Sequence, residues 1–307
     1  MTRPAATADV TVVLGPCDDD RAEVYVRVAG PVLAPLVGTM TGPRRRRDTT
    51  LPATARIVAL PATAADAPPV SRAIVTEPAY WSPELPNLYR LEASAGDVRI
   101  DALIGLRRFG VRGRSFWLDG RRWVPRGVVA GIDVAQAELV SAGLALMAAV
   151  NDAAALGATD REGVAVLAFL GPESLTIERI TSLARHPSAM LAVITEDVPP
   201  VAAAALAASS RSTRGTMLLG RVVDGLLPPP TEIGPFDFLI VALPAAAVPH
   251  DAWRAPPTVP LVAQRRAPVT VSTARAACDA LQRDLASWRL AAASNGPPWD
   301  WAGYCVG

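Results

Sequence analysis

The sequence contains no lysine, so arginine supplies all 30 basic side chains of its 307 residues. It has only two histidines, His186 and His250, and three widely separated cysteines, Cys17, Cys278 and Cys305. These numbers exclude a multi-histidine metal site and argue against a zinc site or a disulfide framework. The net charge of +1 indicates no nucleic-acid partner. We expect neither a metal ion nor a cofactor.

Long apolar runs are absent as well. No stretch approaches the roughly 18 consecutive apolar residues of a membrane-spanning helix, and the first twenty residues lack the apolar core of a signal peptide. Half of the residues are nevertheless apolar and only 19% are charged, which is typical of a folded globular protein. The expected location is the cytoplasm.

Short strands separated by Pro, Gly and Thr clusters fill the first third of the chain. In residues 22–28, Val24, Val26 and Val28 share one face, the period-2 pattern of a half-buried strand. The expected strands are 8–14, 22–28, 55–60, 72–76, 88–93 and 98–106, and their spacing predicts an antiparallel sandwich.

Four adjacent arginines, Arg44, Arg45, Arg46 and Arg47, stand in a segment, residues 42–48, that we expect to be an exposed loop. Four like charges are not buried together. The run is either a solvated charge cluster or a contact with an acidic protein surface or anionic lipid headgroups.

From residue 123 onward, short apolar runs alternate with helical segments, which predicts parallel α/β units. Expected strands are 123–129, 144–150, 164–169, 189–194, 216–223, 237–243, 260–263 and 302–306, the eight that a closed barrel needs. Expected helices are 134–142, 152–161, 175–185, 201–210 and 272–293. Pro-rich segments after the fifth and sixth strands leave little room for helices. The region is also shorter than the roughly 250 residues of a typical barrel, so we expect a compressed (β/α)8 TIM-like barrel.

Residues 81–127 carry one extended motif. It begins with Trp81-Ser82-Pro83-Glu84, continues through Ile104-Gly105-Leu106-Arg107 and Phe116-Trp117-Leu118-Asp119-Gly120, and ends with Arg126-Gly127-Val128. This order resembles the junction of sandwich and barrel in family 2 glycoside hydrolases, the relatives of β-galactosidase, β-glucuronidase and β-mannosidase. The resemblance implies an immunoglobulin-like β-sandwich at 1–115 and a shortened barrel at 116–307. Asp119-Gly120 is also a strong hairpin-turn signal.

The resemblance implies where two catalytic carboxylates would stand. Residues 185–197 resemble the segment with the acid/base, which falls on Asp197 without gaps or on Glu196 after a one-residue slip. Asp is one methylene shorter than the Glu of the family. Residues 259–266 resemble the strand with the nucleophile, and there Gln264 or Arg265 stands in its place. Neither side chain can form a glycosyl ester, and a retaining glycosidase needs both carboxylates.

Other polar residues have ordinary interpretations. His186, in His186-Pro187-Ser188, is expected to anchor the turn before a strand by a backbone hydrogen bond rather than to act as a base. Glu173, Asp224 and Asp300 are expected at strand ends, as helix caps or solvated loop groups rather than as a site.

Two classes of function remain. The first, which we favour, is a non-catalytic glycoside-hydrolase-like pseudoenzyme that serves as a structural or docking subunit through protein–protein contacts. It would belong to a larger cytoplasmic assembly, with the periphery of a membrane complex as one setting for it. The second is an active family 2 glycoside hydrolase, or a relative that binds sugar without cleaving it.

Overall fold

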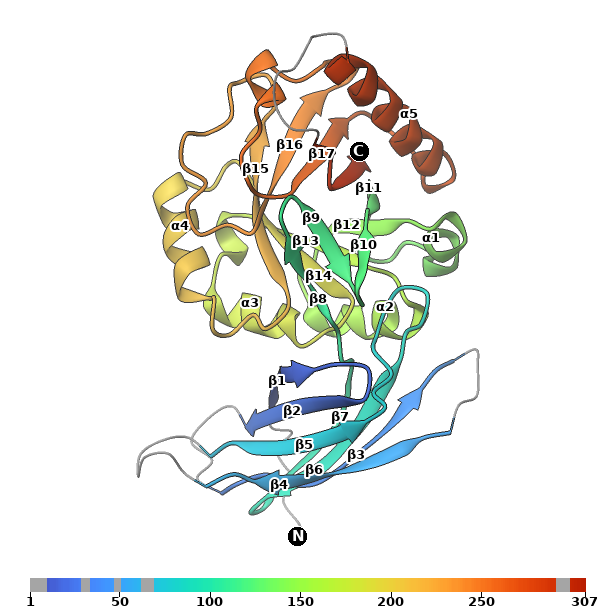
Figure 1. The fold of residues 1–307 in the computed structure, drawn as a ribbon, viewed down its shortest axis with the longest axis vertical. Coiled ribbons are helices and arrows are strands. Elements are labelled where there is room, and N and C mark those ends of the chain that lie inside the picture. The colour runs from blue at the N-terminus through green and yellow to red at the C-terminus, as the bar shows by residue number, and fades with distance from the viewer. Residues whose placement is uncertain (1–9, 29–33, 47–50, 62–68, 291–298) are drawn as a thin grey trace.

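The structure is a computed structural model that describes residues 10–28, 34–46, 51–61, 69–290 and 299–307. An antiparallel sheet formed by the first part of the chain lies beside a closed parallel barrel formed by the second part (Figure 1).

Seven antiparallel strands form one continuous sheet in the order β1-β2-β5-β4-β3-β6-β7. Their bounds are β1 Val10–Cys17, β2 Arg21–Val28, β3 Val37–Arg44, β4 Ala53–Ala59, β5 Ser71–Thr76, β6 Leu88–Ala95 and β7 Val98–Ile104. The sheet curls so that residues from all the strands β2 to β7 share one buried core, with Val24, Met40, Ile57 and Leu91 among them. Alternation places Val24 and Val26 in that core, as the period-2 pattern predicts.

One strand of this sheet, β3, is not evident in the sequence, and it corrects the expected extent of the arginine loop. Residues 42–44 belong to β3, and the loop begins only at Arg45. The apolar pattern of β3 is weak because Met40 is its one large, fully buried side chain. Gly38 is required by close packing, since a Cβ there would lie 2.2 Å from the carbonyl oxygen of Glu92 on β6.

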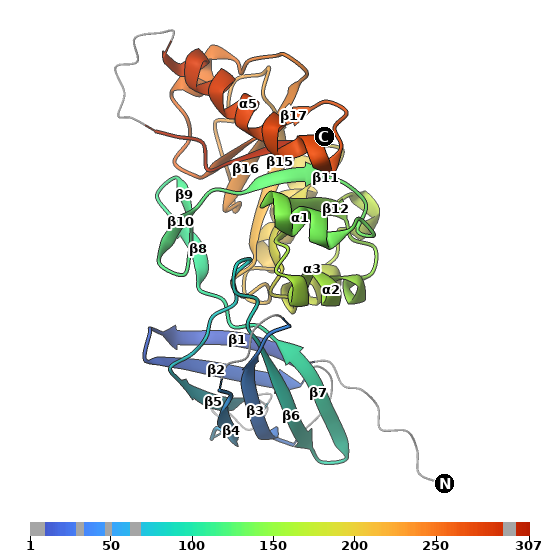
Figure 2. The same ribbon diagram turned by 90° about the vertical axis from the view of Figure 1, so that its right-hand side faces the viewer.

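Three short strands follow the sheet: β8 Phe109–Arg112, β9 Ser115–Leu118 and β10 Arg121–Trp123. The turn between β9 and β10 has positive φ at Asp119 (48°) and Gly120 (75°), which confirms the hairpin signal. The small sheet covers the end of the barrel from which the strands start (Figure 2). There the Phe116 ring meets the Phe238 ring edge-on, with 5.5 Å between centroids. These rings close the N-terminal end of the barrel.

The eight predicted parallel strands close into a barrel in sequence order. They are β11 Arg126–Val129, β12 Ala145–Ala149, β13 Val166–Leu170, β14 Ala189–Ile194, β15 Leu218–Asp224, β16 Phe238–Pro244, β17 Leu261–Arg266 and β18 Gly303–Val306. β18 pairs with both β17 and β11, which completes the ring.

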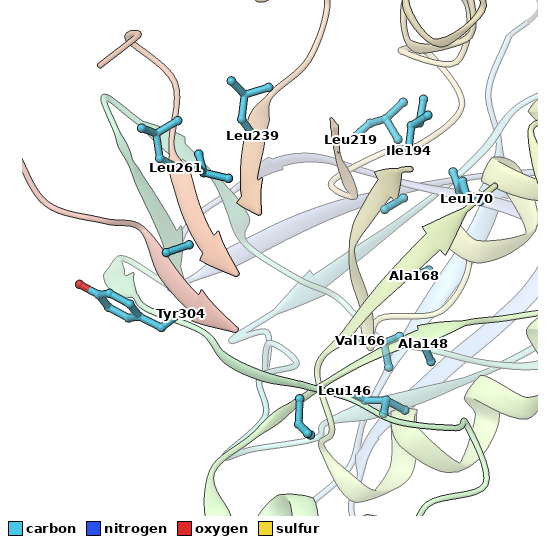
Figure 3. Close-up of a cluster of buried hydrophobic side chains, with 14 of the residues drawn as sticks. Leu146, Ala148, Val166, Ala168, Leu170, Ile194, Leu219, Leu239, Leu261 and Tyr304 are labelled. Atoms are coloured by element: carbon cyan, nitrogen blue, oxygen red, sulfur yellow. The ribbon is translucent and has the colours of Figure 1, made fainter. Parts of the chain in front are cut away.

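Two apolar layers use alternate residues of the barrel strands. One layer lies between strands and helices and includes the side chains of Leu146, Val166, Leu219, Leu239 and Leu261 (Figure 3). The other contains strand residues and no helix residues, and it fills the interior of the barrel down to the β8–β10 sheet. Because successive side chains of a strand point to opposite faces of the barrel wall, strand residues can be assigned to the interior or to the helix side.

The helices match the predicted ones and differ in length. They are α1 Gln136–Ala142, α2 Leu156–Glu162, α3 Ile177–Ala184, α4 Pro200–Ser209 and α5 Val271–Leu290, with short 3-10 turns at Ala153–Ala155, Pro172–Ser174 and Asp251–Arg254. Residues 225–237 contain no helix and residues 245–260 contain only a 3-10 turn, so the barrel is compressed after β15 and β16, as the prolines predict. Among the described residues, no helix has the length and apolar character needed to cross a membrane.

The carboxylate of Asp160, on α2, is buried where the sheet meets the barrel. It accepts hydrogen bonds from the backbone nitrogen of Ser188 at 3.0 Å and from Ser188 Oγ at 2.6 Å. His186 Nδ1 lies 2.7 Å from the other carboxylate oxygen. The expectation of a backbone bond from His186 was therefore wrong, because the ring has a carboxylate partner 26 residues away.

The curled sheet is attached to this same network. The indole nitrogen of Trp81 donates to the carbonyl oxygen of Asp160 at 2.9 Å. Arg107, which is buried, donates to the carbonyl oxygens of Pro187 and Ala189 on the barrel side. Burial lowers the pKa of Arg107 to about 10 and the charge of Asp160 opposes that shift, so the guanidinium stays charged at neutral pH. Its charge and the carboxylate stabilise one another across the junction.

The Asp160→Asn variant tests this junction. It should lose about 3 kcal/mol of unfolding free energy, because it leaves His186, Ser188 and the buried Arg107 without their carboxylate. Urea denaturation followed by circular dichroism measures this loss. Asp133→Asn, at an exposed residue, is the control and should change stability by less than about 0.5 kcal/mol. Equal stability of both variants would contradict the proposed role of the network.

Candidate functional site at the mouth of the barrel

The carboxyl ends of the strands form the mouth of the barrel, the usual place for an active site in this architecture. Glu196 and Asp197 follow directly after β14 and both are exposed there. β17 ends at the same edge with Gln264, Arg265 and Arg266. The structure therefore brings the expected acid/base candidates and the expected nucleophile strand to one face.

Gln264 and Arg265 point in opposite directions. Val262 on β17 belongs to the barrel interior, so Gln264, two residues later, also faces inward. Its side chain is buried and its amide nitrogen donates to the carbonyl oxygen of Gly307 at 3.1 Å. Arg265 points to the helix side, where Nη1 donates to Asp284 Oδ2 of α5 at 2.6 Å. Of the two predicted positions, only Gln264 faces the interior, and it carries an amide.

Arg266 is a residue of the mouth that the resemblance to the family did not single out. Its Nη2 donates to Glu196 Oε2 at 2.7 Å, so the strand expected to carry a carboxylate nucleophile provides a cation to the acid/base candidate. The hydrogen bond to Glu196 raises the pKa of Arg266, and the charges of Glu196 and Asp224 add to this effect while burial opposes it. The period-2 count from Val262 through Gln264 would have placed Arg266 at the mouth.

An open depression of about 630 Å³ lies at the mouth, over the ends of β12, β13 and β14. Its lining includes Asn151, Phe169, Glu173, Thr195, Asp197 and Arg179 of α3. Burial lowers the pKa of Arg179 while the charge of Asp152 opposes the shift. Its Nη2 is buried without a hydrogen-bond partner among the described residues. The depression can accept a polar ligand.

The remaining acidic residues have the ordinary roles expected for them, with one correction. Asp224, at the end of β15, accepts a hydrogen bond from the backbone nitrogen of Leu226 at 2.8 Å and so shapes the following turn. Asp300 lies at the opposite end of the barrel, before β18, where Arg122 Nη2 is 3.3 Å away. The expectation that it follows a strand was wrong, because the last strand begins after it.

The arginine run lies away from the mouth. Arg44 ends β3 and is exposed, Arg46 pairs with Glu162 of α2, and Arg45 lines a cavity beside α2. Arg47 lies outside the described residues. Among the described residues, no three His, Cys, Asp or Glu side chains come together as a metal site would require.

Comparison of the whole fold with solved structures gives consistent matches. A β-glucuronidase from Ruminococcus gnavus superposes with a TM-score of 0.64 and 12% identity over 98% of this chain and 61% of its own. A β-D-glucuronidase from Dictyoglomus thermophilum superposes with a TM-score of 0.60 and 14% identity, over 97% of this chain and 61% of its own. A glycosyl hydrolase family 2 member from Bacteroides cellulosilyticus superposes with a TM-score of 0.62 and 16% identity, over 98% of this chain and 44% of its own.

The chain has a family 2 glycoside hydrolase-like fold. No family model and no curated protein sequence matches it, so the likeness rests on structure. The chain spans between 44% and 61% of the length of these three glycosidases. In this glycoside hydrolase-like barrel, the two positions implied for catalytic carboxylates carry Glu196 or Asp197 on one side and Gln264 on the other.

The ion pair at the mouth should contribute little to folding. The Arg266 and Glu196 side chains are 47% and 51% exposed, and exposed pairs are worth about 0.2 to 1 kcal/mol. A double-mutant cycle with Arg266→Met and Glu196→Gln, followed by urea denaturation, measures this coupling. The more buried pair of Arg214 and Asp237, 5% and 21% exposed, is the comparison and should couple several-fold more strongly. A coupling above about 2 kcal/mol at the mouth would contradict the expectation.

Proposed function

We propose that this chain is a non-catalytic glycoside-hydrolase-like protein, an immunoglobulin-like curled sheet with a compressed barrel, that serves as a structural or docking subunit of a larger protein assembly. The observation that carries the proposal is the ion pair between Arg266 and Glu196 across the mouth of the barrel. A retaining glycosidase holds two carboxyl groups about 5 to 5.5 Å apart. Here the strand implied to hold the nucleophile presents an amide and a guanidinium.

The ion pair also engages the acid/base candidate. Glu196 Oε2 accepts a hydrogen bond from Arg266 Nη2 at 2.7 Å, whereas a general acid must place its carboxyl group within hydrogen-bond reach of the leaving-group oxygen. The mouth is therefore suited neither to nucleophilic attack nor to proton donation by these residues.

Exposed apolar side chains support a docking role. Leu226, Leu227 and Val248 are 46%, 59% and 50% exposed, in the loops after β15 and β16. The backbone nitrogen of His250 donates to the carbonyl oxygen of Gly225 at 2.8 Å, so the two loops lie together. Exposed apolar groups gathered in one region are typical of protein–protein contact sites.

The proposal includes a cytoplasmic location. In its stronger form it places the assembly at the cytoplasmic face of a membrane complex, with the exposed Arg44 directed toward an acidic or anionic partner.

A second candidate function is sugar binding without hydrolysis. It is favoured by the depression at the mouth, whose lining includes Asn151, Arg179 and Asp197 as polar groups for a ligand. Isothermal titration calorimetry with D-glucuronic acid and D-galactose tests it. Binding that is lost in Arg179→Gln but kept in Arg211→Gln would establish this function in place of a purely structural one.

The proposal predicts that the protein does not cleave glycosides. Nitrophenyl β-D-glucuronide, β-D-galactoside and β-D-mannoside should be hydrolysed no faster by the protein than by the double variant Glu196→Gln, Asp197→Asn. The alternative, an active family 2 glycoside hydrolase, predicts turnover that disappears in that variant, and such a result would refute the non-catalytic proposal.

The proposed docking role predicts that the protein migrates as part of a larger complex. In a native extract, the protein should migrate well above its own mass of 32.1 kDa on size-exclusion chromatography. A Leu226→Asp, Leu227→Asp variant should shift toward the monomer, because charge in an apolar contact is costly. Val201→Asp, at an 82% exposed position on α4, is the control and should behave as the wild type. Monomeric migration of the wild type would rule the role out.

A further inference from the structure

A second cavity, of about 340 Å³, lies far from the mouth at the opposite end of the strands. It is bounded by residues that precede β11, β12 and β13 and by the loop between β5 and β6, which reaches α2 at the junction with the sheet (Figure 1). Gly163, at the end of α2, contacts Pro83 of that loop so closely that a Cβ would lie 2.2 Å from the Pro83 carbonyl oxygen. Both parts of the fold thus form its walls.

The polar lining of this cavity is mostly cationic. Five arginines line it: Arg45, Arg46, Arg126, Arg161 and Arg275. The lining has two carboxylates, Glu84 and Glu162, and Arg46 is paired with Glu162.

One further carboxylate behind the wall is shared between two of these arginines. Arg126 Nε donates to Asp279 Oδ1 at 2.7 Å, and Arg275 Nε lies 3.4 Å from Asp279 Oδ2. The hydrogen bond from Arg126 lowers the pKa of Asp279, so Asp279 carries its negative charge at neutral pH. Among the described residues around the cavity, arginines therefore outnumber carboxylates.

Arg161 is the clearest uncompensated cation. It lies in the last turn of α2, it is exposed, and it makes no ion pair or side-chain hydrogen bond with the residues that the structure describes. Its removal should therefore leave the fold unchanged, which makes it the position of choice for a test.

Part of the lining is apolar. Trp123 is half-buried there, held edge-on by Phe109 with 5.5 Å between ring centroids, and Val140, Leu144 and Pro86 complete the wall. A cavity of about 300 to 1,000 Å³ with an apolar wall and a few converging polar groups is typical of small-molecule sites. The ligand should combine an anionic group with an apolar organic body.

We propose that this cavity binds the phosphate group of a phosphate monoester whose organic part packs against Trp123. A phosphate monoester carries a charge of about −1.5 to −2 at neutral pH, and Arg161 offers it a cation that pairs with no described residue. The planar guanidinium fork donates two parallel hydrogen bonds to phosphate oxygens, a geometry that arginine provides and a single ammonium does not. The site is independent of the barrel mouth and of its proposed lack of catalysis.

Isothermal titration calorimetry with phenyl phosphate tests the proposal on the full chain. Binding should be saturable and should weaken as salt rises, because the contacts are charge-assisted. Arg161→Glu should weaken it by about tenfold or more, and Arg161→Gln by a smaller factor. Arg211→Glu makes the same charge change at an exposed residue outside the cavity and should leave the affinity unchanged. Circular dichroism verifies that each variant is folded.

Vesicles of phosphatidylcholine with phosphatidic acid distinguish the two sources of a phosphate monoester. Co-sedimentation that is lost in Arg161→Glu would support the proposal with a lipid headgroup as ligand, and binding of phenyl phosphate alone would support it with a free metabolite. Absence of saturable phenyl phosphate binding, together with vesicle binding that is absent or unaffected by Arg161→Glu, would overturn the proposal. So would equal loss of affinity in Arg161→Glu and Arg211→Glu.

Discussion

The buried carboxylate of Asp160 is the interaction on which the arrangement of the two parts depends. Besides α2 itself, segments from three places in the chain meet at Asp160. Residues 186–188 bind its carboxylate, Trp81 donates to its backbone carbonyl oxygen, and Arg107 interacts with it through its charge. A buried charge is tolerated only when it is paired and hydrogen-bonded, so each of these segments must be in place for the others to be stable. Two of the motifs through which the sequence resembles family 2 glycoside hydrolases, residues 81–84 and 104–107, belong to these segments. The resemblance therefore reports the geometry of the junction, which an active and an inactive barrel would equally need.

The mouth of the barrel follows a different logic, because nothing in the junction or in the two apolar layers depends on it. Paired carboxylates near one another repel, and active sites retain such repulsion because catalysis requires a shifted pKa. The Arg266–Glu196 pair is attractive and lies at a half-exposed site. The non-catalytic role proposed above is compatible with such a pair, since a barrel without catalytic demands has no need of two carboxylates held close together.

The sequence predicted most of the barrel because its strands are strongly apolar and its helices have clear stripes, as in α5 with Cys278, Leu281 and Trp288 buried on one side. The prediction from sequence failed where the apolar pattern of a strand is weak, or where the hydrogen-bond partner of a residue is distant in the sequence. β3 has one large buried side chain, Met40, and its Gly38 is required for close packing against β6. The partner of His186, Asp160, lies 26 residues away on α2, and Glu196 and Arg266 are 70 residues apart. Alternation along β17 separates Gln264 from Arg265, but no local rule gives the ion pair that follows.

The absence of lysine has a structural counterpart beyond composition. Buried or half-buried arginines join distant segments by donating from two or three nitrogens at once, as Arg107 does to Pro187, Ala189 and Thr216, and Arg126 does to Asp279 and Gln282. An ammonium group is a compact point charge on a flexible stem and lacks this fixed fork. Arginines held in this way keep their guanidinium planes in fixed orientations. At the cavity beside α2, Arg126 is held in this way by Asp279 and Gln282, so the same property that joins distant segments also fixes one guanidinium of the proposed anion site.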